Sequence, residues 1–292
     1  MSEINKGGHT SPSRTAPSRI APTQTTPTTH RRKKKKSSKA LYYVLLIVLL
    51  AVLVFSAVKI ISYLKQKSLS EKQQNAITDE FITPIYNGEG DTTNTDDLSS
   101  ANPSDPQPEQ IHVNFDKLTE KYPDVVGYIY GANTGINYPI VQGSDNDFYL
   151  KHDYDGNVNN NGSIFMEYLC NSGFSNGNTI IYGHHMKSGL MFAHLENYKN
   201  QSYYDAHPYF YIYTPDQNYR LELFAGCVVN GDADIYSLNP GSDIISDLVA
   251  KSTFKSKIGT PTGNIVTLST CDYTPGYNEA KYVVLGQLVP ID

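Results

Sequence analysis

Three side chains suited to acyl-transfer chemistry lie beside short apolar runs in the C-terminal part of this 292-residue chain. Cys271 ends the motif TLSTC, His184 directly follows the run IIYG, and Lys281 opens the run KYVVL. A thiolate stabilised by an imidazolium attacks carbonyl carbons, and the imidazole then protonates the departing amine. A cation and backbone N–H groups can stabilise the oxyanion that forms in between. Together, these residue types indicate a cysteine transpeptidase.

The remaining cysteines and the second histidine fit this chemistry less well. Cys227 lies in the apolar run FAGCVV and Cys170 in a polar loop, and a free cysteine is commonly a small buried side chain. An odd number of cysteines also argues against a complete disulfide framework. A metal site built on His184, His185 and a distant cysteine is an alternative, but it lacks a ligand pair at familiar zinc spacing. We expect neither a metal nor a cofactor.

Short β-type runs, separated by Gly, Asn and Asp, must position the reactive side chains. Their spacing is typical of a barrel or a sandwich. The eight runs span residues 125–130, 136–141, 163–166, 179–182, 209–213, 219–225, 264–268 and 282–285. We expect a mostly β fold, an eight-stranded barrel, formed by residues 111–292, a length sufficient to bury a core.

Two helices are expected within this domain. Residues 114–121 begin at a possible N-cap, Asn114, and stop before Pro123. Residues 243–254 carry apolar side chains at i, i+1, i+4 and i+5, which predicts an amphipathic helix. This second helix is inserted before the strand that leads to Cys271.

The N-terminal segments predict a membrane anchor. Residues 1–39 are rich in Ser, Thr and Pro and hold ten basic residues against the single Glu3, so we expect a disordered basic tail. The uncharged stretch 40–58 spans about 28 Å as a helix, close to the ~30 Å hydrocarbon core of a bilayer. We therefore predict a single transmembrane signal anchor over residues 40–64, in contact with the lipid bilayer.

A cleaved signal peptide is the competing interpretation of this stretch. Its apolar region would be shorter and would end at an Ala-x-Ala-like site, and no convincing site is present. The basic cluster RRKKKK precedes the apolar stretch, so the positive-inside rule places the N-terminus in the cytoplasm and the later residues outside the cell.

Residues 65–110 are acidic and rich in Asn, Thr, Ser, Asp and Pro, which favours an extracellular stalk whose first part, 66–80, continues as a helix. A partner-binding tail is the alternative. Residues 111–292 hold ten basic and nineteen acidic residues. Without a broad basic patch, nucleic acid is not an expected partner.

Several motifs in a fixed order resemble the sortases, and TLSTC resembles their class B form. Besides Tyr182–His184 and Thr267–Cys271, the similarity rests on the helix over 243–257. It also rests on the segments 137–143, 145–150, 162–165 and 184–192. The resemblance covers most of residues 111–292 and implies the eight-stranded sortase-type barrel.

The resemblance implies a membrane-anchored transpeptidase of a Gram-positive cell. Such enzymes cut the sorting motif of surface proteins after its Thr, form a thioacyl enzyme and pass the acyl group to a peptidoglycan or pilin amine. By motif position, Cys271 is the nucleophile and His184 the acid/base, whereas His185 is a neighbour without that role. The positions that match the substrate groove are Asn146, Leu150, Tyr182, Ser269 and Asp272. Asp272 is also a candidate for orienting the histidine.

One position departs from the family pattern. The resemblance implies an Arg before the last strand, where this chain has Lys281, which keeps the charge but lacks the planar guanidinium. Either Lys281 replaces it, or Arg220, the single arginine after the anchor, supplies the guanidinium from a neighbouring strand. The alternatives to a wall-anchoring enzyme are a pilin-polymerising sortase, a thiol peptidase without transfer, and a catalytically weak domain that binds sorting motifs.

Overall fold

The computed structural model describes residues 38–85 and 110–291. The chain divides into two units, with the boundary between Val54 and Phe55. The basic tail predicted for residues 1–39 lies almost entirely outside the described residues, as does the second half of the predicted stalk.

The first element is a long helix, α1 (Ser38–Phe81). Its N-terminal stretch is strongly apolar, and the large side chains between Leu41 and Val58 are mostly exposed, as a lipid-facing surface requires. By length and composition, α1 is the one helix of the described residues that could cross a membrane.

The C-terminal part of α1 belongs to the folded unit that follows Val54. Ile77 and Phe81 are buried in an apolar cluster with residues of the barrel wall. The hydroxyl of Ser70 accepts hydrogen bonds from Asn159 (3.0 Å) and Asn161 (2.8 Å). Residues 65–81 are therefore helix packed on the domain, where the composition predicted a solvated stalk with at most a helical start.

A two-stranded antiparallel sheet follows directly after α1. It joins β1 (Ile82–Ile85) to β2 (Gln110–Val113), with Ile82 opposite Val113. Since β1 also lies in the predicted stalk, the described fold includes residues well before the domain boundary expected at residue 111. Neither strand was predicted, because β1 lies inside the segment assigned to the stalk by its composition and β2 begins at the last residue of that segment.

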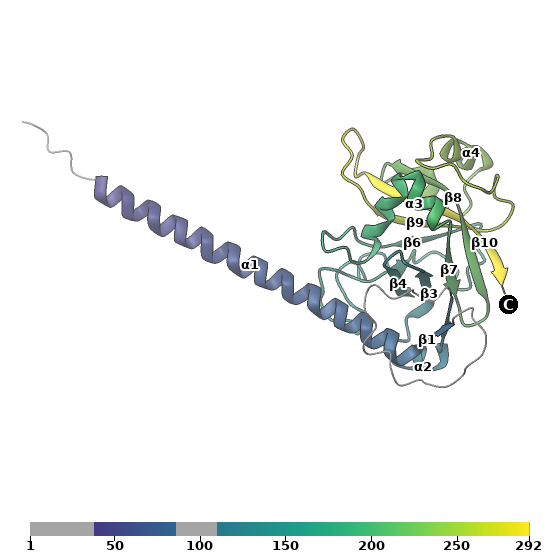
Figure 1. Ribbon diagram of the computed structural model, residues 1–292, viewed down its shortest axis with the longest axis horizontal. Coiled ribbons are helices and arrows are strands. Elements are labelled where there is room, and N and C mark those ends of the chain that lie inside the picture. Colours follow the sequence, from purple (N-terminus) through teal and green to yellow (C-terminus); the bar gives the residue numbers. More distant parts are fainter. Residues whose placement is uncertain (1–37, 86–109, 292) are drawn as a thin grey trace, which may run out of the picture. The chain divides into compact units, whose positions relative to one another are not determined.

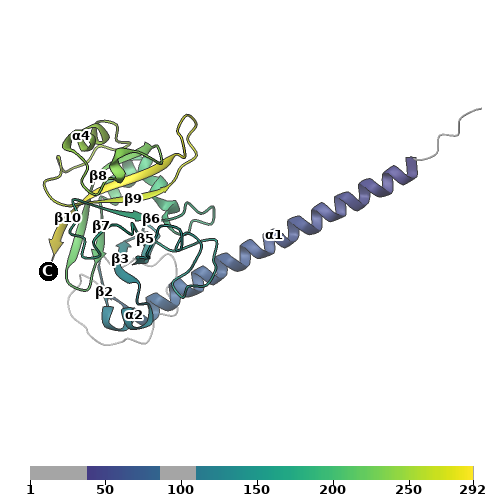
Figure 2. The ribbon, with the colours of Figure 1, turned by 180° about the vertical axis from the view of Figure 1, so that it is seen from behind.

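Eight strands form a closed barrel (Figures 1 and 2). The order around the barrel is β10-β8-β7-β3-β4-β5-β6-β9. The strands are β3 (Val125–Gly131), β4 (Ile136–Val141), β5 (Phe165–Met166), β6 (Asn178–Tyr182), β7 (Tyr209–Tyr213), β8 (Asn218–Val229), β9 (Ile265–Cys271) and β10 (Lys281–Ile291). The predicted eight-stranded barrel is confirmed. Two of its pairings are parallel, β4 with β5 and β6 with β9, and the others are antiparallel.

Buried apolar side chains form the barrel core and two further clusters. The core includes Ile129, Phe192 and Leu268, all fully buried. A second cluster joins the barrel wall to α1 and α2, and a third lies under α4. The barrel strands thus carry apolar residues on both faces, which explains their nearly continuous apolar sequences.

Both helices predicted in the domain are present. In α2 (Phe115–Lys121), the side chain of Asn114 accepts a hydrogen bond from the amide of Lys117, so Asn114 is the N-cap. The inserted helix is α4 (Ser242–Ala250), with Ile245 and Leu248 buried. Three further short elements were not predicted: η2 (Phe192–Lys199), α3 (Gln201–Ala206) and η3 (Asp234–Tyr236).

Candidate active site

Cys271 and Lys281 are direct partners at the end of the β9–β10 pair. The amide of Asp272 donates to the carbonyl of Ala280 at 2.8 Å. Because such bonded pairs alternate with unbonded ones along antiparallel strands, Cys271 and Lys281 form an unbonded pair, whose side chains approach most closely. Lys281 Nζ accordingly lies 3.4 Å from Cys271 Sγ and donates to it.

His184 reaches the same place because β6 runs parallel to β9. Tyr182, the last residue of β6, lies opposite Ser269, and the amide of Gly183 donates to the carbonyl of Ser269 at 3.1 Å. A Cβ at Gly183 would lie 2.4 Å from Ile164 Cδ1, so only glycine fits between β6 and His184. Two adjacent strands that end at the same edge therefore present the imidazole and the thiol together.

The ring of His184 is fixed by one backbone group. Its Nε2 lies 2.8 Å from the carbonyl oxygen of Leu150. Since a carbonyl only accepts, Nε2 carries a proton and donates, which leaves Nδ1 available for proton transfer. In this structure the hydrogen-bond partner of the Cys271 thiol is Lys281 and not His184.

A pocket of about 200 Å³ joins the three reactive side chains. It contains four of the five residues predicted to line a substrate groove. The lining residues are Asn146, Leu150, Phe165, Tyr182, Gly183, His184, Ser269, Thr270, Cys271 and Lys281. Phe165 and Thr270 were not predicted to line the groove, although Thr270 belongs to the TLSTC motif and Phe165 to the segment 162–165.

The fifth predicted residue, Asp272, lies outside this lining. Its carboxylate pairs with Lys199 Nζ at 2.6 Å and accepts from the amide of Thr274 at 2.8 Å. Burial alone would raise the pKa of Asp272, but the hydrogen bonds from Lys199 and Thr274 outweigh it and lower the pKa. This carboxylate is thus engaged by Lys199 and not by His184, which it was a candidate to orient.

A buried carboxylate behind the pocket was missed from the sequence. Glu167 Oε2 accepts from Asn146 Nδ2 at 2.6 Å and from the hydroxyl of Tyr182 at 3.0 Å. Burial, together with the nearby Glu167 charge, raises the pKa of Tyr182. Glu167 thereby holds two lining residues, Asn146 and Tyr182. No local sequence pattern predicts this arrangement.

A second tyrosine, Tyr236, stacks on the ring of Tyr182 at 6.2 Å between centroids and contacts another lining residue. The hydroxyls of Tyr236 and Ser269 lie 2.8 Å apart, and burial raises the pKa of Tyr236 to about 12. Tyr236 comes from η3, inside the long connection between β8 and β9. It therefore keeps its proton at neutral pH and can serve as a donor.

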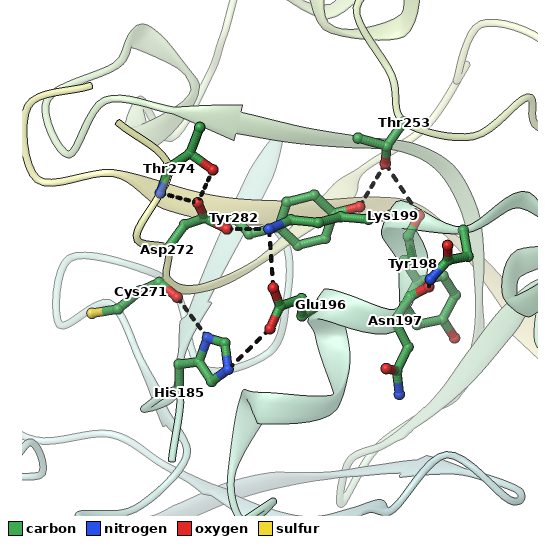
Figure 3. Close-up of polar contacts among 11 residues, drawn as sticks. His185, Glu196, Asn197, Tyr198, Lys199, Thr253, Cys271, Asp272, Thr274 and Tyr282 are labelled. Atoms are coloured by element: carbon green, nitrogen blue, oxygen red, sulfur yellow. Dashed lines mark hydrogen bonds and ion pairs between the residues drawn. The ribbon is translucent and has the colours of Figure 1, made fainter. Parts of the chain in front are cut away.

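His185 makes contacts that the sequence did not predict. Figure 3 shows its imidazole between the carbonyl oxygen of Cys271 and the carboxylate of Glu196, while the sulfur of Cys271 points away from it. The Nδ1 atom lies 3.0 Å from the carbonyl oxygen of Cys271, and Nε2 lies 3.2 Å from Glu196 Oε2.

Arg220 is far from this pocket. It lies opposite Val289 on β10, whereas Lys281 lies opposite Val229, nine residues further along β8. At ~3.3 Å per residue, that separation is about 30 Å. Arg220 instead pairs with Glu222 and lies over the ring of Tyr209. Lys281 is thus the cation at the thiol, and the alternative in which Arg220 supplies the guanidinium is wrong.

The other two cysteines are buried and outside the pocket lining. Burial raises the pKa of the Cys227 thiol to about 12 and also raises that of Cys170. Both thiols therefore stay protonated at neutral pH, unlike a nucleophile. Within residues 38–85 and 110–291, no group of three His, Cys, Asp or Glu residues is arranged to hold a metal ion.

Comparison with known proteins gives a consistent result. A family model described as a sortase domain matches residues 132–289. Sortase B of Listeria monocytogenes is 32% identical over 246 residues, which cover 82% of this chain and 92% of that protein. Sortase B of Staphylococcus aureus is 29% identical over 189 residues, covering 63% of this chain and 78% of that protein.

Solved structures agree with these sequence matches. The sortase B–substrate complex of S. aureus superimposes with a TM-score of 0.56 at 28% identity, over 61% of this chain and 85% of that one. The sortase B of B. anthracis gives a TM-score of 0.58 at 27% identity, over 78% of this chain and all of that one.

Proposed function

Because this chain belongs to the sortase family and is a class B-type cysteine transpeptidase, we propose that it works as a membrane-anchored enzyme that attaches proteins to the cell wall. In this proposal it cleaves a sorting motif after Thr through a thioacyl intermediate and transfers the protein to a peptidoglycan amine. The anchor is the apolar N-terminal part of α1, with the N-terminus in the cytoplasm and the barrel outside.

The observation that carries the chemistry is the position of Lys281 Nζ, 3.4 Å from Cys271 Sγ, in one pocket with His184. An ammonium at this distance donates to the sulfur and places a cation beside the nucleophile before substrate arrives. Once the thiolate has attacked the substrate carbonyl, the negative charge lies on the carbonyl oxygen, which is bonded to the same carbon as the sulfur. Lys281 then has a donor close to that oxygen.

His184 is the proposed acid/base. Its Nε2 proton is committed to the carbonyl of Leu150, so Nδ1 gives a proton to the departing amine and later takes one from the incoming amine. The fixed Nε2 bond keeps the ring from turning between these two steps. The remaining pocket residues Asn146, Leu150, Tyr182 and Ser269 are proposed to contact the sorting motif.

Asp272 is proposed to support the groove through its contacts with neighbouring residues and not to touch the substrate. Its carboxylate holds Lys199 and the start of the β9–β10 connection, next to the nucleophile. This placement supports a part in shaping the site more than direct contact with substrate.

The full-length chain in detergent tests the function. It is incubated with peptides carrying candidate sorting motifs, with and without an oligoglycine or lysine amine, and the products are read by mass spectrometry. We expect cleavage after Thr and an added amine on the product, both lost in Cys271→Ala. Transfer to the lysine amine alone would favour a pilin-polymerising enzyme, and addition of water alone would favour a thiol peptidase.

Lys281→Arg decides how well lysine serves at this position. A guanidinium offers two parallel donors to the oxyanion, so we expect faster turnover in Lys281→Arg than in the wild type. Glu222→Gln, which lies with Arg220 far from the pocket, is the control. No thioacyl adduct with any peptide, even in Lys281→Arg, would contradict catalysis and favour a domain that only binds sorting motifs.

A further inference from the structure

A chain of four charged or chargeable side chains lies beside the nucleophile, on the side away from its sulfur (Figure 3). It runs from His185 to Glu196 (3.2 Å), from Glu196 to Lys199 (3.3 Å), and from Lys199 to Asp272 (2.6 Å). At its start, His185 Nδ1 meets the backbone carbonyl of Cys271 at 3.0 Å. The proposed function gives the contacts of His185 and Glu196 no task.

The carbonyl of Cys271 needs a partner from outside the sheet. Cys271 and Lys281 form an unbonded pair, so the backbone N–H and C=O of Cys271 point away from β10 and toward β6. The β6 ladder ends with the bond from Gly183 to Ser269, and the backbone of His185 has turned to pair with Met191. The side chain of His185 therefore supplies the bond that the backbone of β6 would otherwise make.

Both ring nitrogens of His185 face groups that only accept. The Cys271 carbonyl has no proton to give, and neither does an ionised Glu196. A neutral imidazole has one N–H and can satisfy one of these partners, whereas the imidazolium satisfies both. The geometry is thus complete only when His185 is charged, and the four side chains then alternate in sign.

The far end of the chain holds the segment that joins Cys271 to Lys281. Asp272 begins this connection and accepts from Thr274, and its amide bonds Ala280, just before Lys281. Through Lys199 and Glu196, both on η2, the connection is tied back to His185. One network thereby fixes the backbone of the nucleophile and the start of the loop that returns to the catalytic cation.

We propose that His185, as an imidazolium, is a positioning residue for the acyl transfer, holding the Cys271 backbone to η2 and the β9–β10 connection. The proposal rests on the proposed function, since it assumes that Cys271 is the nucleophile. His185 does not exchange protons with substrate, because its ring faces the carbonyl and not the sulfur of Cys271.

His185 is expected to affect the reaction by keeping the nucleophile in its position. A misplacement of ~1 Å at a reacting atom can cost roughly 10²-fold in rate. Without His185, the Cys271 carbonyl loses its partner and the loop loses its link to η2. We expect His185→Ala to lower kcat by roughly 10- to 100-fold with little change in KM, because Asn146, Tyr182 and Ser269 are held by Glu167 and Tyr236 and not by His185.

Two amide variants separate the two bonds. Asn places its amide nitrogen near the position of Nδ1 and can still donate to the Cys271 carbonyl, whereas Gln places its nitrogen near Nε2 and can reach only Glu196. Neither amide titrates. Glu196→Gln removes the charge but offers both a donor and an acceptor to either form of His185. Glu222→Gln is the matched control on the distant Arg220 pair.

The test measures kcat and KM of the full-length chain in detergent, with a sorting-motif peptide and an amine. We expect His185→Asn to keep most of the wild-type kcat and His185→Gln to lose as much as His185→Ala. Glu196→Gln should keep most of the wild-type kcat, because its amide can still pair with the His185 ring. Equal loss in Asn and Gln variants, or a His185→Ala variant within twofold of the wild type, would overturn the proposal.

Amide hydrogen exchange gives a readout that needs no substrate. Residues 271–280 should exchange faster in His185→Ala and His185→Gln than in the wild type and His185→Asn, while Glu222→Gln stays unchanged. Uniform exchange in this segment across all variants would contradict the anchoring role even in an active enzyme. A wild-type chain without transfer activity would instead overturn the proposed function, and the exchange pattern would still decide whether His185 holds the loop.

Discussion

His184 donates from Nε2 to the backbone carbonyl of Leu150 at 2.8 Å, so the orientation of the proposed acid/base depends on a loop 34 residues away in sequence. The loop is itself held by backbone bonds on both sides of Leu150. Ser163 donates to Tyr149 at 2.9 Å, and Asn159 donates to Lys151 at 2.8 Å. The placement of the imidazole is therefore a property of this loop as much as of β6.

Gly162 tests this dependence without touching the imidazole. Its φ of +59° favours glycine, and an added Cβ would lie 2.6 Å from the Tyr149 oxygen and 2.8 Å from the Leu150 oxygen. We expect Gly162→Ala to displace the acceptor of His184 and lower kcat by roughly tenfold or more in the transfer assay. Gly259→Ala, where the new Cβ would meet nothing within 4 Å, is the control and should keep wild-type activity. Equal activity of the two variants would contradict the dependence.

The C-terminal part of α1 should contribute to the stability of the barrel unit. Ile77 is fully buried against the barrel wall, so Ile77→Ala should lower the free energy of unfolding by about 2–5 kcal/mol. Leu69, on the same helix but 52% exposed, is the matched control, and Leu69→Ala should change it little. Denaturant unfolding followed by tyrosine fluorescence measures both. A stalk that merely spans distance would give no difference between the two variants.

Asp272 predicts a pH dependence of stability. Hydrogen bonds from Lys199 and Thr274 overcome the effect of burial and lower its pKa in the folded state. A lowered carboxyl pKa stabilises the fold above the unfolded pKa of about 3.9, and this contribution is lost as pH falls through the folded value. We expect Asp272→Asn to be less stable than the wild type at pH 7, with the difference shrinking below about pH 4.

Lys199, the partner of Asp272, makes the stability of the fold depend on pH on the alkaline side. Burial alone would lower its pKa, but the pairing with Asp272 and Glu196 raises it. A raised lysine pKa stabilises the fold below the unfolded value of about 10.4, and the contribution is lost as pH rises through the folded value. Denaturant unfolding between pH 3 and pH 11 measures both limbs. A difference between Asp272→Asn and wild type that stays constant at low pH would show that the pairing does not stabilise the fold.

The barrel strands and their positions along the chain could be predicted because each run is apolar and bounded by turn residues. The membrane-length helix and the N-cap at Asn114 have equally local signals. The end of the helix could not be predicted in this way. Residues 65–81 are polar on average, and their packing depends on a few side chains, such as Ile77, that meet a surface built from distant sequence.

In the candidate site, too, the features with local sequence signals could be predicted and those that depend on distant residues could not. Cys271 ends β9, Lys281 opens β10 and His184 lies two residues after β6, so their places near strand ends could be predicted from the sequence. The role of His185 depends on a carbonyl 86 residues away and on Glu196 in a short 3₁₀ helix. Glu167 likewise meets Asn146 and Tyr182 only through the fold. Such contacts form only when the barrel closes, so no local sequence pattern predicts them.

The lysine beside the nucleophile gives this enzyme a means of modifying itself. Under the proposed function, the acyl carbon of the intermediate is bonded to Sγ, which lies 3.4 Å from Nζ of Lys281. An unprotonated amine can attack that carbon, whereupon the C–S bond breaks and the proton lost by the nitrogen goes to the departing sulfur, which regenerates the thiol. The product is an amide on Lys281 that the enzyme cannot release.

This internal capture should increase with pH, because only the neutral amine is a nucleophile. Without an acceptor amine, peptide mapping should find the acyl group on Lys281 in the wild type, but not in Cys271→Ala or Lys281→Arg. A guanidinium stays protonated and is inert in this way. The number of turnovers before self-inactivation is therefore set by one side chain, and an acceptor must reach the thioester faster than the neighbouring lysine does.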